Sequence, residues 1–199
     1  MSLGVLYSWS VFSLNLTEVL GWSKTSAALP YTIAIVLFAL MMIPGGRMQD
    51  RFGGRKVAAL GGILTGLGFL GSGALTTSLG VGLFFGVISG SGIGIAYAAV
   101  TPSVIRWFPD ERKGLVTGIV VSGFGLSALY MAPLTNYLIN SFGIQTSFSI
   151  IGGAILLLVT AASQFLFPAE SAGSVGKSGT VADQGWKEIV FSKAFIMLW

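Results

Sequence analysis

The chain has 199 residues, of which 53% are hydrophobic and 9% are charged, and its formal net charge is +4. Soluble domains usually carry about 25% charged residues, so this composition excludes an ordinary water-soluble globular domain. The chain has no cysteine and no histidine. Their absence excludes disulfides and thiol chemistry, and it removes the commonest proton shuttle and metal ligand.

Two long stretches without charge indicate a membrane protein. Residues 57–105 and 114–169 contain no Asp, Glu, Lys or Arg, and the mean hydropathy of the chain is +0.84. A helix needs about 20 apolar residues to cross the hydrocarbon core, where its backbone groups must be satisfied internally. We therefore predict an all-α integral membrane bundle.

Hydropathy and helix-breaking residues divide the chain into six predicted spans. In chain order they are residues 4–16, 25–44, 57–75, 79–105, 114–139 and 145–167. The first is shorter than a full crossing, and the segment from residue 189 to 199 reads as the beginning of a seventh. We therefore expect a fragment or a truncated gene product, clipped at both ends.

Three segments follow from this pattern. Residues 1–167 are predicted to form a transmembrane bundle, and residues 189–199 to begin a further transmembrane helix. Residues 168–188 are rich in Gly, Ser and Ala and have no hydrophobic period, which is typical of a flexible linker.

The connections between the spans predict an orientation. On one side the basic residues are Arg47, Arg51, Arg55, Lys56, Arg106, Arg112, Lys113, Lys177 and Lys187. On the other side the connections hold only Lys24. Because short cytoplasmic loops carry an excess of Lys and Arg, we expect the basic connections, the linker and the N-terminus to be cytoplasmic.

Small residues recur every four positions in two spans. They are Gly82, Gly86, Gly90 and Gly94 in the fourth, and Gly114, Gly118 and Ser122 in the fifth. Such rows let helix backbones approach closely in lipid. Generic tight packing is one interpretation, and a sliding surface in a protein that changes shape is the other.

The connection after the second span carries a motif. It begins at Gly46, continues with Asp50-Arg51 and Gly53, and ends with the basic pair Arg55-Lys56. This pattern resembles the signature loop of the major facilitator superfamily. Residue 54 is Gly, where many members have the first basic residue. That variant is similar to the branch that contains oxalate/formate antiporters and monocarboxylate transporters.

Four further stretches carry a closer resemblance. They are the first span at 4–12, the Gly-Tyr-Pro segment at 92–102, the Trp-Phe-Pro-Asp turn at 106–114 and the Gly-rich segment at 118–125. Together they resemble the oxalate/formate antiporter family over nearly the whole chain. The resemblance implies the six-helix N-terminal half of a twelve-helix bundle, a secondary carrier of small organic anions and a bacterial or archaeal cytoplasmic membrane. The partners that it implies are a small carboxylate, the lipid bilayer and the C-terminal half of the same transporter.

The resemblance also implies a conformational latch at the signature loop. The residues concerned are Gly46, Asp50, Arg51, Gly53, Arg55 and Arg106. Asp50 is the only acid beside four basic residues, and its charge suits the positive end of the helix that follows. We expect it to pair with Arg106 at the end of the fourth span. The alternative is that the basic residues only enforce topology and meet anionic lipid.

The spans themselves hold no ionisable side chain of Asp, Glu, Lys, Arg or His away from their ends. A bound anion needs a cationic partner in such a medium, and the resemblance implies an arginine in the other half. Hydroxyl and aromatic residues remain as cavity lining in this half, and our candidates are Tyr7, Ser10, Tyr97, Thr101 and Tyr130. A tyrosine offers a flat wall and one phenolic hydrogen bond. The alternative for each tyrosine is a packed ring or an anchor at the membrane interface.

Three classes of function are compatible with a membrane bundle of this composition. The leading hypothesis is a secondary active transporter of small mono- or dicarboxylates such as lactate, formate or oxalate, by antiport or proton symport with alternating access. The alternative is a non-transporting bundle or an inactive half-transporter. An enzyme is disfavoured because the spans provide no general base or metal ligand. No cofactor, metal or nucleic acid is expected.

Overall fold

The computed structural model describes residues 6–105, 108–164 and 166. This part of the chain is helical and contains no strand. The chain divides into two units, Met1–Ala169 and Glu170–Trp199, and every helix below belongs to the first. The linker predicted at 168–188 and the helix predicted from residue 189 lie outside the described residues.

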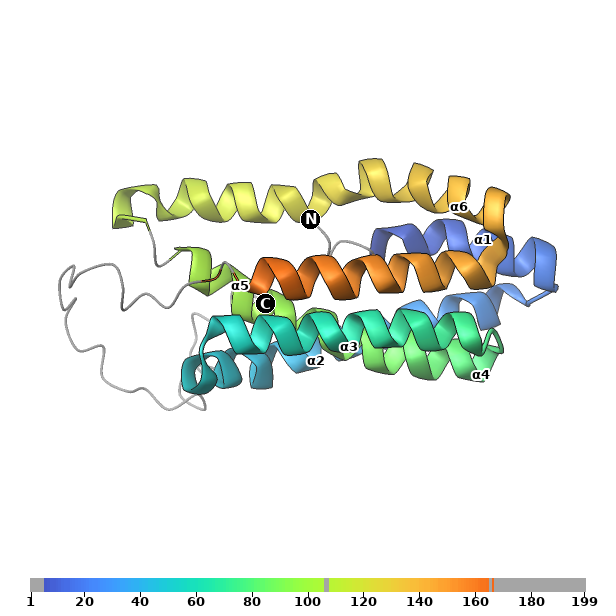
Figure 1. Ribbon diagram of the computed structural model, residues 1–199, viewed down its shortest axis with the longest axis horizontal. Helices are drawn as coiled ribbons and strands as arrows, with labels where there is room; N and C mark the ends of the chain where they lie inside the picture. Colours follow the sequence, from blue (N-terminus) through green and yellow to red (C-terminus); the bar gives the residue numbers. More distant parts are fainter. Residues whose placement is uncertain (1–5, 106–107, 165, 167–199) are drawn as a thin grey trace, which may run out of the picture. The chain divides into compact units, whose positions relative to one another are not determined.

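The helices follow the predicted order (Figure 1). The first three are α1 (Trp9–Leu20), α2 (Lys24–Phe52) and α3 (Gly54–Ala74). The fourth span combines α4 (Ser78–Val81), the π-helix η2 (Gly82–Ser89) and α5 (Gly90–Ile105). A 3-10 turn, η3 (Asp110–Arg112), leads into α6 (Lys113–Ser163).

The helix α6 contains two predicted spans. It runs for 51 residues, and at Gly143 its backbone leaves the helical region with φ 80° and ψ 169°. Only glycine adopts a positive φ without a steric cost, so the chain reverses direction at this residue. The two spans predicted on either side are therefore separate helical arms (Figure 1). The sequence predicts a break of four residues, 140–143, between these spans. In the structure residues 140–142 remain helical, so the break is shorter than predicted.

Length and composition confirm a membrane fold. Among the described residues, four helical segments are long and apolar enough to cross a bilayer, namely α2, α3, the α4–α5 span (Ser78–Ile105) and α6. The described part of the first helix, α1, has 12 residues. At about 1.5 Å per residue, α1 covers less than a crossing, and α6 has the length of two. The prediction of an all-α membrane bundle is confirmed.

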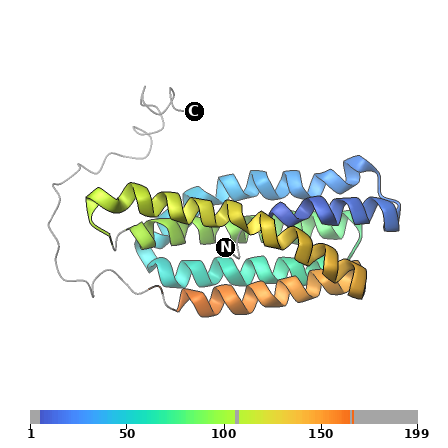
Figure 2. The same cartoon turned by 90° about the horizontal axis from the view of Figure 1, so that it is seen from above.

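The fourth span lies between α2 and α3 because glycines on its two faces let both neighbours approach. A Cβ atom at Gly90 would lie 2.6 Å from Cα of Ala34 in α2. On the other face, a Cβ atom at Gly92 would lie 2.6 Å from the backbone nitrogen of Thr65 in α3. Helices in lipid gain stability from such close packing. The second half of α6 packs along α3, and the two lie side by side in both views (Figures 1 and 2).

The glycine row of the fifth span behaves differently. A Cβ atom added at Gly114 or Gly118 would have no described neighbour within 4 Å, and Ser122 is exposed. The expected packing face therefore has no partner within this part of the chain. The row in the fourth span packs on α2 through Gly86, Gly90 and Gly94.

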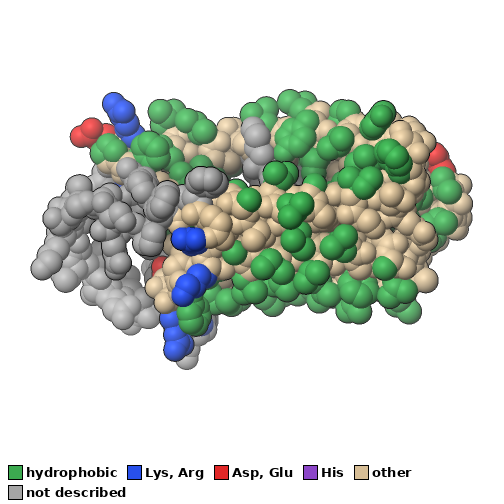
Figure 3. All heavy atoms as spheres, viewed as in Figure 1, with side chains coloured by type: hydrophobic (Ala, Val, Ile, Leu, Met, Phe, Trp, Pro, Cys, Tyr) green, Lys and Arg blue, Asp and Glu red, His purple; other side chains and the backbone are tan. Residues whose placement is uncertain are grey.

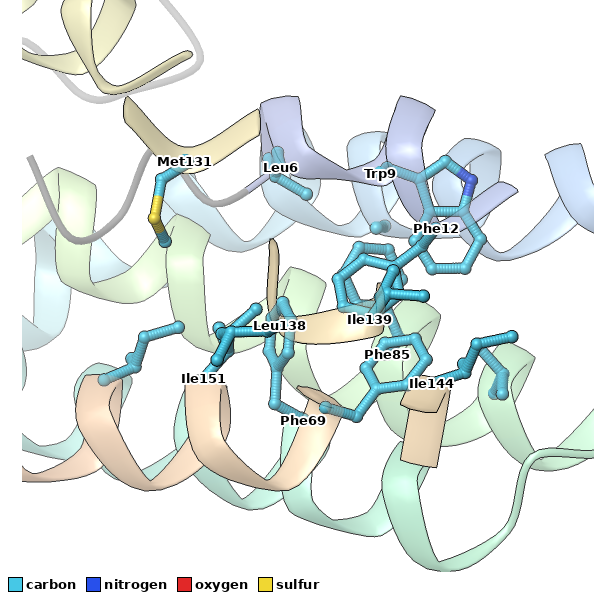
Figure 4. Packing of buried hydrophobic residues seen from close by; sticks show 14 of the residues in the cluster. Leu6, Trp9, Phe12, Phe69, Phe85, Met131, Leu138, Ile139, Ile144 and Ile151 are labelled. Carbon is cyan, nitrogen blue, oxygen red and sulfur yellow. The ribbon is translucent and has the colours of Figure 1, made fainter. Parts of the chain in front are cut away.

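An aromatic cluster holds α1 against the bundle (Figure 4). Trp9 stacks on Phe85 of η2 with ring centroids 4.3 Å apart, and Phe12 stacks on Phe148 of α6 at 4.0 Å. Phe69 of α3 contacts Phe85 edge to face at 5.2 Å. All five rings are buried. One face of α1 is thereby fixed inward, so the opposite face of this helix points away from the core.

Basic side chains gather at one end of the helices (Figure 3). We call this the basic end, and by their places at the end of α2, the start of α3 and around η3 its described members are Arg47, Arg51, Arg55, Lys56, Arg112 and Lys113. The opposite end contains the α1–α2 connection, where Lys24 begins α2. The separation agrees with the asymmetry that the sequence predicts.

Candidate functional site

The signature motif lies at the junction of α2 and α3 rather than in a loop. The helix α2 continues to Phe52, so Gly46, Asp50 and Arg51 occupy its last turns. The predicted end of this span at residue 44 was wrong by two turns. The reason is that Met, Gln and Arg are good helix formers, so the helix continues after the hydrophobic pattern stops. Between α2 and α3 only Gly53 is non-helical, with φ 85° and ψ 149°.

The next residue, Gly54, explains the departure from the common motif. A Cβ atom at Gly54 would collide with the Oγ atom of Ser103 in α5 and lie 3.1 Å from its Cβ. A basic side chain has no room there without a shift of α3 or α5. The start of α3 is thus pressed against the end of α5. Sequence reasoning missed Ser103, because nothing in its local pattern identifies it as a contact.

The motif arginines have different partners. Arg55 donates from Nε to Oε1 of Gln164 at 2.9 Å, and its Nη2 donates to the same atom. The guanidinium of Arg51 lies 5.4 Å from the centre of the Phe52 ring. Asp50 is exposed in the last turn of α2. Its expected partner Arg106 lies outside the described residues, so the pair stays a prediction.

The junction therefore joins four helix ends. The start of α3 meets the end of α5 at Ser103, the end of α2 adjoins α3 through Gly53, and Gln164 brings in the end of α6. Such a convergence suits a latch, because a shift of any one helix disturbs the others. Gln164 was not among the predicted site residues, and its position after a long apolar span gave no functional signal.

The candidate cavity residues on α1 are accessible. Tyr7, in the turn before α1, is 43% exposed, and Ser10 is also exposed. The hydroxyl of Ser10 donates to the carbonyl of Tyr7 at 3.3 Å. Both lie on the side of α1 opposite to the aromatic cluster. Both residues are exposed in the described part of the chain.

The candidates on α5 are more enclosed. Tyr97 packs edge to face on Phe38 of α2, with centroids 5.8 Å apart and an interplanar angle of 63°. Thr101 is one turn further along the same face, and its buried Oγ1 has no hydrogen-bond partner. An unpaired buried hydroxyl is unfavourable. Within the described structure this hydroxyl is enclosed and unsatisfied, as are those of Thr135 and Thr160.

The fifth candidate, Tyr130 of α6, is 41% exposed. Its neighbour Met131 and the neighbour of Tyr7, Leu6, belong to one buried cluster (Figure 4). Tyr7 and Tyr130 thus flank the same packed region from two helices. Tyr97 and Thr101 lie on a third helix, α5.

Two hollows of about 430 Å³ each are lined by other residues. One lies between α1 and α2 near Glu18 and Lys24. The other lies near Asn15, the α3–α4 turn and the Gly143 reversal, where Nε2 of Gln145 donates to Oγ1 of Thr76 at 3.0 Å. Neither contains any of the five predicted cavity residues.

The sequence profile of the Major Facilitator Superfamily matches residues 1–199. The chain belongs to this superfamily. The resemblance drawn from the motifs is confirmed. Membership places the chain among integral membrane transport proteins and not among enzymes.

Named relatives agree with this assignment. The chain is 29% identical to the oxalate:formate antiporter of Oxalobacter formigenes, over 98% of its own length and 47% of the relative. It is 30% identical to the uncharacterised superfamily transporter YhjX of Escherichia coli (strain K12), over 79% of the chain and 39% of the relative. It is 28% identical to monocarboxylate transporter 11 of Mus musculus, over 87% of the chain and 38% of the relative. The chain spans less than half of the length of each.

Proposed function

We propose that this chain forms one half of a secondary active transporter for small organic anions. The substrates are mono- or dicarboxylates such as lactate, formate or oxalate, moved by antiport or proton symport with alternating access. The observation that carries the proposal is the match over 98% of the chain to a protein named an oxalate:formate antiporter. Superfamily membership over residues 1–199 supports it.

The chemistry of the spans is consistent with this role if a cation outside this chain balances the negative charge of the substrate. The membrane-spanning segments of the described part hold no Asp, Glu, Lys, Arg or His away from their ends. A carboxylate in a low-dielectric cavity needs a cation, which in this proposal comes from the other half. Hydroxyl donors at Tyr7, Ser10, Tyr97, Thr101 and Tyr130 then orient the anion.

The open faces of the helices support a second bundle as partner. Gly114 and Gly118 meet no described neighbour, and the most hydrophobic window of α2 is only 17% buried. Lipid covers part of such surface, and in the proposal a C-terminal half covers the rest. Two halves that rock against each other expose a shared site to either side in turn.

The junction of α2 and α3 is the proposed latch. Asp50 pairs with Arg106 in one conformation and separates in the other, while Arg55 and Gln164 keep α3 on α6. The basic end faces the cytoplasm in a bacterial or archaeal membrane, because that orientation satisfies the positive-inside rule. The segment 168–188 then serves as a cytoplasmic linker to the other half.

A second candidate is a bundle that does not transport. It is favoured by one observation, that neither described hollow contains any of the five candidate cavity residues. In this alternative the tyrosines are packing residues and interfacial anchors, and the chain acts as an inactive half.

Counterflow separates the two candidates. The full gene product that contains this chain is reconstituted in liposomes preloaded with oxalate, formate or lactate, and uptake of the same labelled anion is measured. We expect uptake with at least one carboxylate and none with the 199-residue chain alone. A monodisperse full-length protein that moves none of these anions would reject the transporter. Uptake by the isolated chain would reject the need for a second half.

A further inference from the structure

The fourth span changes its helix type between two ordinary α-helical segments. Residues 82–89 form the π-helix η2, which lies between α4 and α5. Where η2 ends, the backbone N–H of Gly90 donates to the carbonyl of Phe85, five residues earlier instead of four. π-helical turns are rare, and they occur frequently at functional sites. Neither the proposed cavity nor the proposed latch uses a residue of this segment.

The helix α5, which follows η2, is clamped between two neighbours. A Cβ atom at Gly90 would lie 2.6 Å from Cα of Ala34 in α2, and one at Gly92 would lie 2.6 Å from the backbone nitrogen of Thr65 in α3. Both neighbours therefore contact the backbone of α5 directly. Because packed interiors leave no spare volume, a rotation of α5 would drive larger side chains into these contacts. We therefore take α5 as the fixed part of the span.

The half of η2 that adjoins α5 is also fixed. The hydroxyl of Ser89 donates to the carbonyl of Thr65 in α3 at 3.0 Å, and both residues are fully buried. The ring of Phe85 lies between Trp9 of α1 and Phe69 of α3, with centroid distances of 4.3 Å and 5.2 Å (Figure 4). These contacts come from two other helices, so they hold this half in place from both sides.

The other end of the span has fewer contacts. A Cβ atom at Gly82 would meet nothing within 4 Å among the described residues. Val81 is buried, but Leu79 and Leu83 are 88% and 54% exposed. Segments with few buried contacts open and move at a low free-energy cost. The loose part of the span is therefore α4 together with the first turn of η2.

The hydrogen-bond pattern of η2 provides the length that such a movement needs. A π-helical segment holds about one residue more than an α-helix that joins the same contacts. If each carbonyl exchanges its partner at i+5 for the one at i+4, the segment becomes α-helical. Because α5 is clamped, this exchange displaces α4 and the α3–α4 turn. Thr76 in that turn accepts a hydrogen bond from Nε2 of Gln145 in α6 at 3.0 Å, so the displacement also reaches the reversal at Gly143.

We propose that η2 is a hinge that alternates between π-helical and α-helical winding. It moves α4 and the α3–α4 turn, at the end opposite to the basic end, while α5 stays in place. Each carbonyl keeps one N–H partner in both windings, so no buried hydrogen bond is lost. The use of this movement, to open and close that end of the pathway, rests on the proposed function. The change of winding itself does not require transport.

Deletion of a single residue tests whether η2 holds an extra one. The full gene product that contains this chain is purified without Gly82, and its thermal unfolding is compared with that of the unchanged protein. We expect a folded protein, because the contacts on both sides of Gly82 are kept and the segment becomes α-helical. The matched control is deletion of Leu67, an exposed residue in the regular helix α3. That deletion turns the rest of α3 by about 100° away from its partners and abolishes folding.

Hydrogen–deuterium exchange measured by mass spectrometry follows the winding without transport. In the unchanged protein we expect the amides of residues 82–89 to exchange faster than those of α5, and deletion of Gly82 to slow them to the rate of α5. Ser89→Ala removes the tie to α3 and speeds exchange in η2 by about two- to twelve-fold, which corresponds to the net value of one hydrogen bond. Ser72→Ala is the control, because Ser72 is equally buried but donates to the Gly68 carbonyl of its own helix. It leaves exchange in η2 unchanged.

Counterflow tests whether transport uses the hinge. We expect deletion of Gly82 to reduce carboxylate counterflow to the background level while the inserted amount of protein stays the same. Full counterflow in this variant would overturn the role in transport. Uniform exchange over residues 82–99, or unfolding as severe as that caused by deletion of Leu67, would overturn the hinge itself. A full-length protein that moves no carboxylate rejects the proposed function, and the exchange rates then decide the hinge alone.

Discussion

Arg55, at the start of α3, donates two hydrogen bonds to the Oε1 atom of Gln164, which follows the last residue of α6. The two residues are 109 positions apart in the sequence. Their contact ties the third and sixth spans at the basic end, beside the place where Gly54 meets Ser103. It gives a motif arginine a partner within the same bundle.

The first prediction concerns this tie. Arg55→Ala removes both hydrogen bonds at a solvent-exposed position, so it lowers the free energy of unfolding by about 0.5–1 kcal/mol. Thermal unfolding in detergent measures the change. Lys56→Ala, one residue further on, is the control, because Lys56 is exposed and has no described partner. Equal effects of the two substitutions would mean that the tie contributes nothing.

The second prediction concerns the close approach of α3 to α5. Gly54→Ala introduces one methyl group that collides with Ser103, and such overpacking costs about 1–3 kcal/mol. Gly46→Ala is the matched control, since a Cβ atom there meets nothing within 4 Å. Adding Ser103→Ala to Gly54→Ala removes the nearest atom and restores part of the loss. A Gly54→Ala protein as stable as the control would contradict the contact.

These two contacts mark the limit of what the sequence predicts. Hydropathy identified the spans, and the distribution of Arg and Lys identified the basic end, because both depend on local composition. Ser103 and Gln164 have no local signal, since their importance comes from helices that are distant in the sequence. The π-helix at residues 82–89 was also missed, because its residues are as apolar as those of an ordinary span.

At the end of α2 the local sequence pattern predicted the wrong structure. The sequence indicated a loop where the charged residues begin, but helix propensity carries α2 to Phe52. Of the candidate cavity residues, Tyr7 and Tyr130 are exposed, and their role in a cavity stays a prediction. Whether all five residues line one cavity depends on how a second bundle packs against this one. The sequence pattern of these residues does not determine that packing.

The third prediction concerns the anchoring of α1. Trp9→Phe keeps an aromatic ring against Phe85 but removes the indole donor to the Ala27 carbonyl. The Ala27 carbonyl lies inside α2 and keeps its helical partner but loses this second bond, so stability falls by about 0.5–1.5 kcal/mol. Phe12→Leu serves as a comparison, because it shortens a buried side chain without removing a hydrogen bond. The prediction fails if Trp9→Phe unfolds at the same temperature as the unchanged protein.

The fourth prediction concerns the latch and rests on the proposed function. Asp50→Asn removes the charge and keeps the size of the side chain, so counterflow by the full-length transporter falls strongly while the amount inserted in the membrane stays the same. Glu111→Gln makes the same change at another exposed position of the basic end and retains activity. Full activity of Asp50→Asn would reject the latch.

The last prediction uses the unpaired hydroxyl of Thr101. Its buried Oγ1 has no hydrogen-bond partner, so Thr101→Val removes a polar atom that costs about 1–3 kcal/mol when left unsatisfied, and the variant unfolds at a higher temperature. Thr135→Val is the matched control, because the hydroxyl of Thr135 is also buried and unpaired.

The two variants differ in transport if Thr101 contacts the substrate. Thr101→Val then raises the KM for the carboxylate several-fold in counterflow, because an anion loses a hydrogen bond that the empty site does not satisfy. Thr135→Val leaves KM unchanged. If both variants gain stability and both keep their KM, Thr101 is a packing residue and the hydroxyl face of α5 is not part of the cavity.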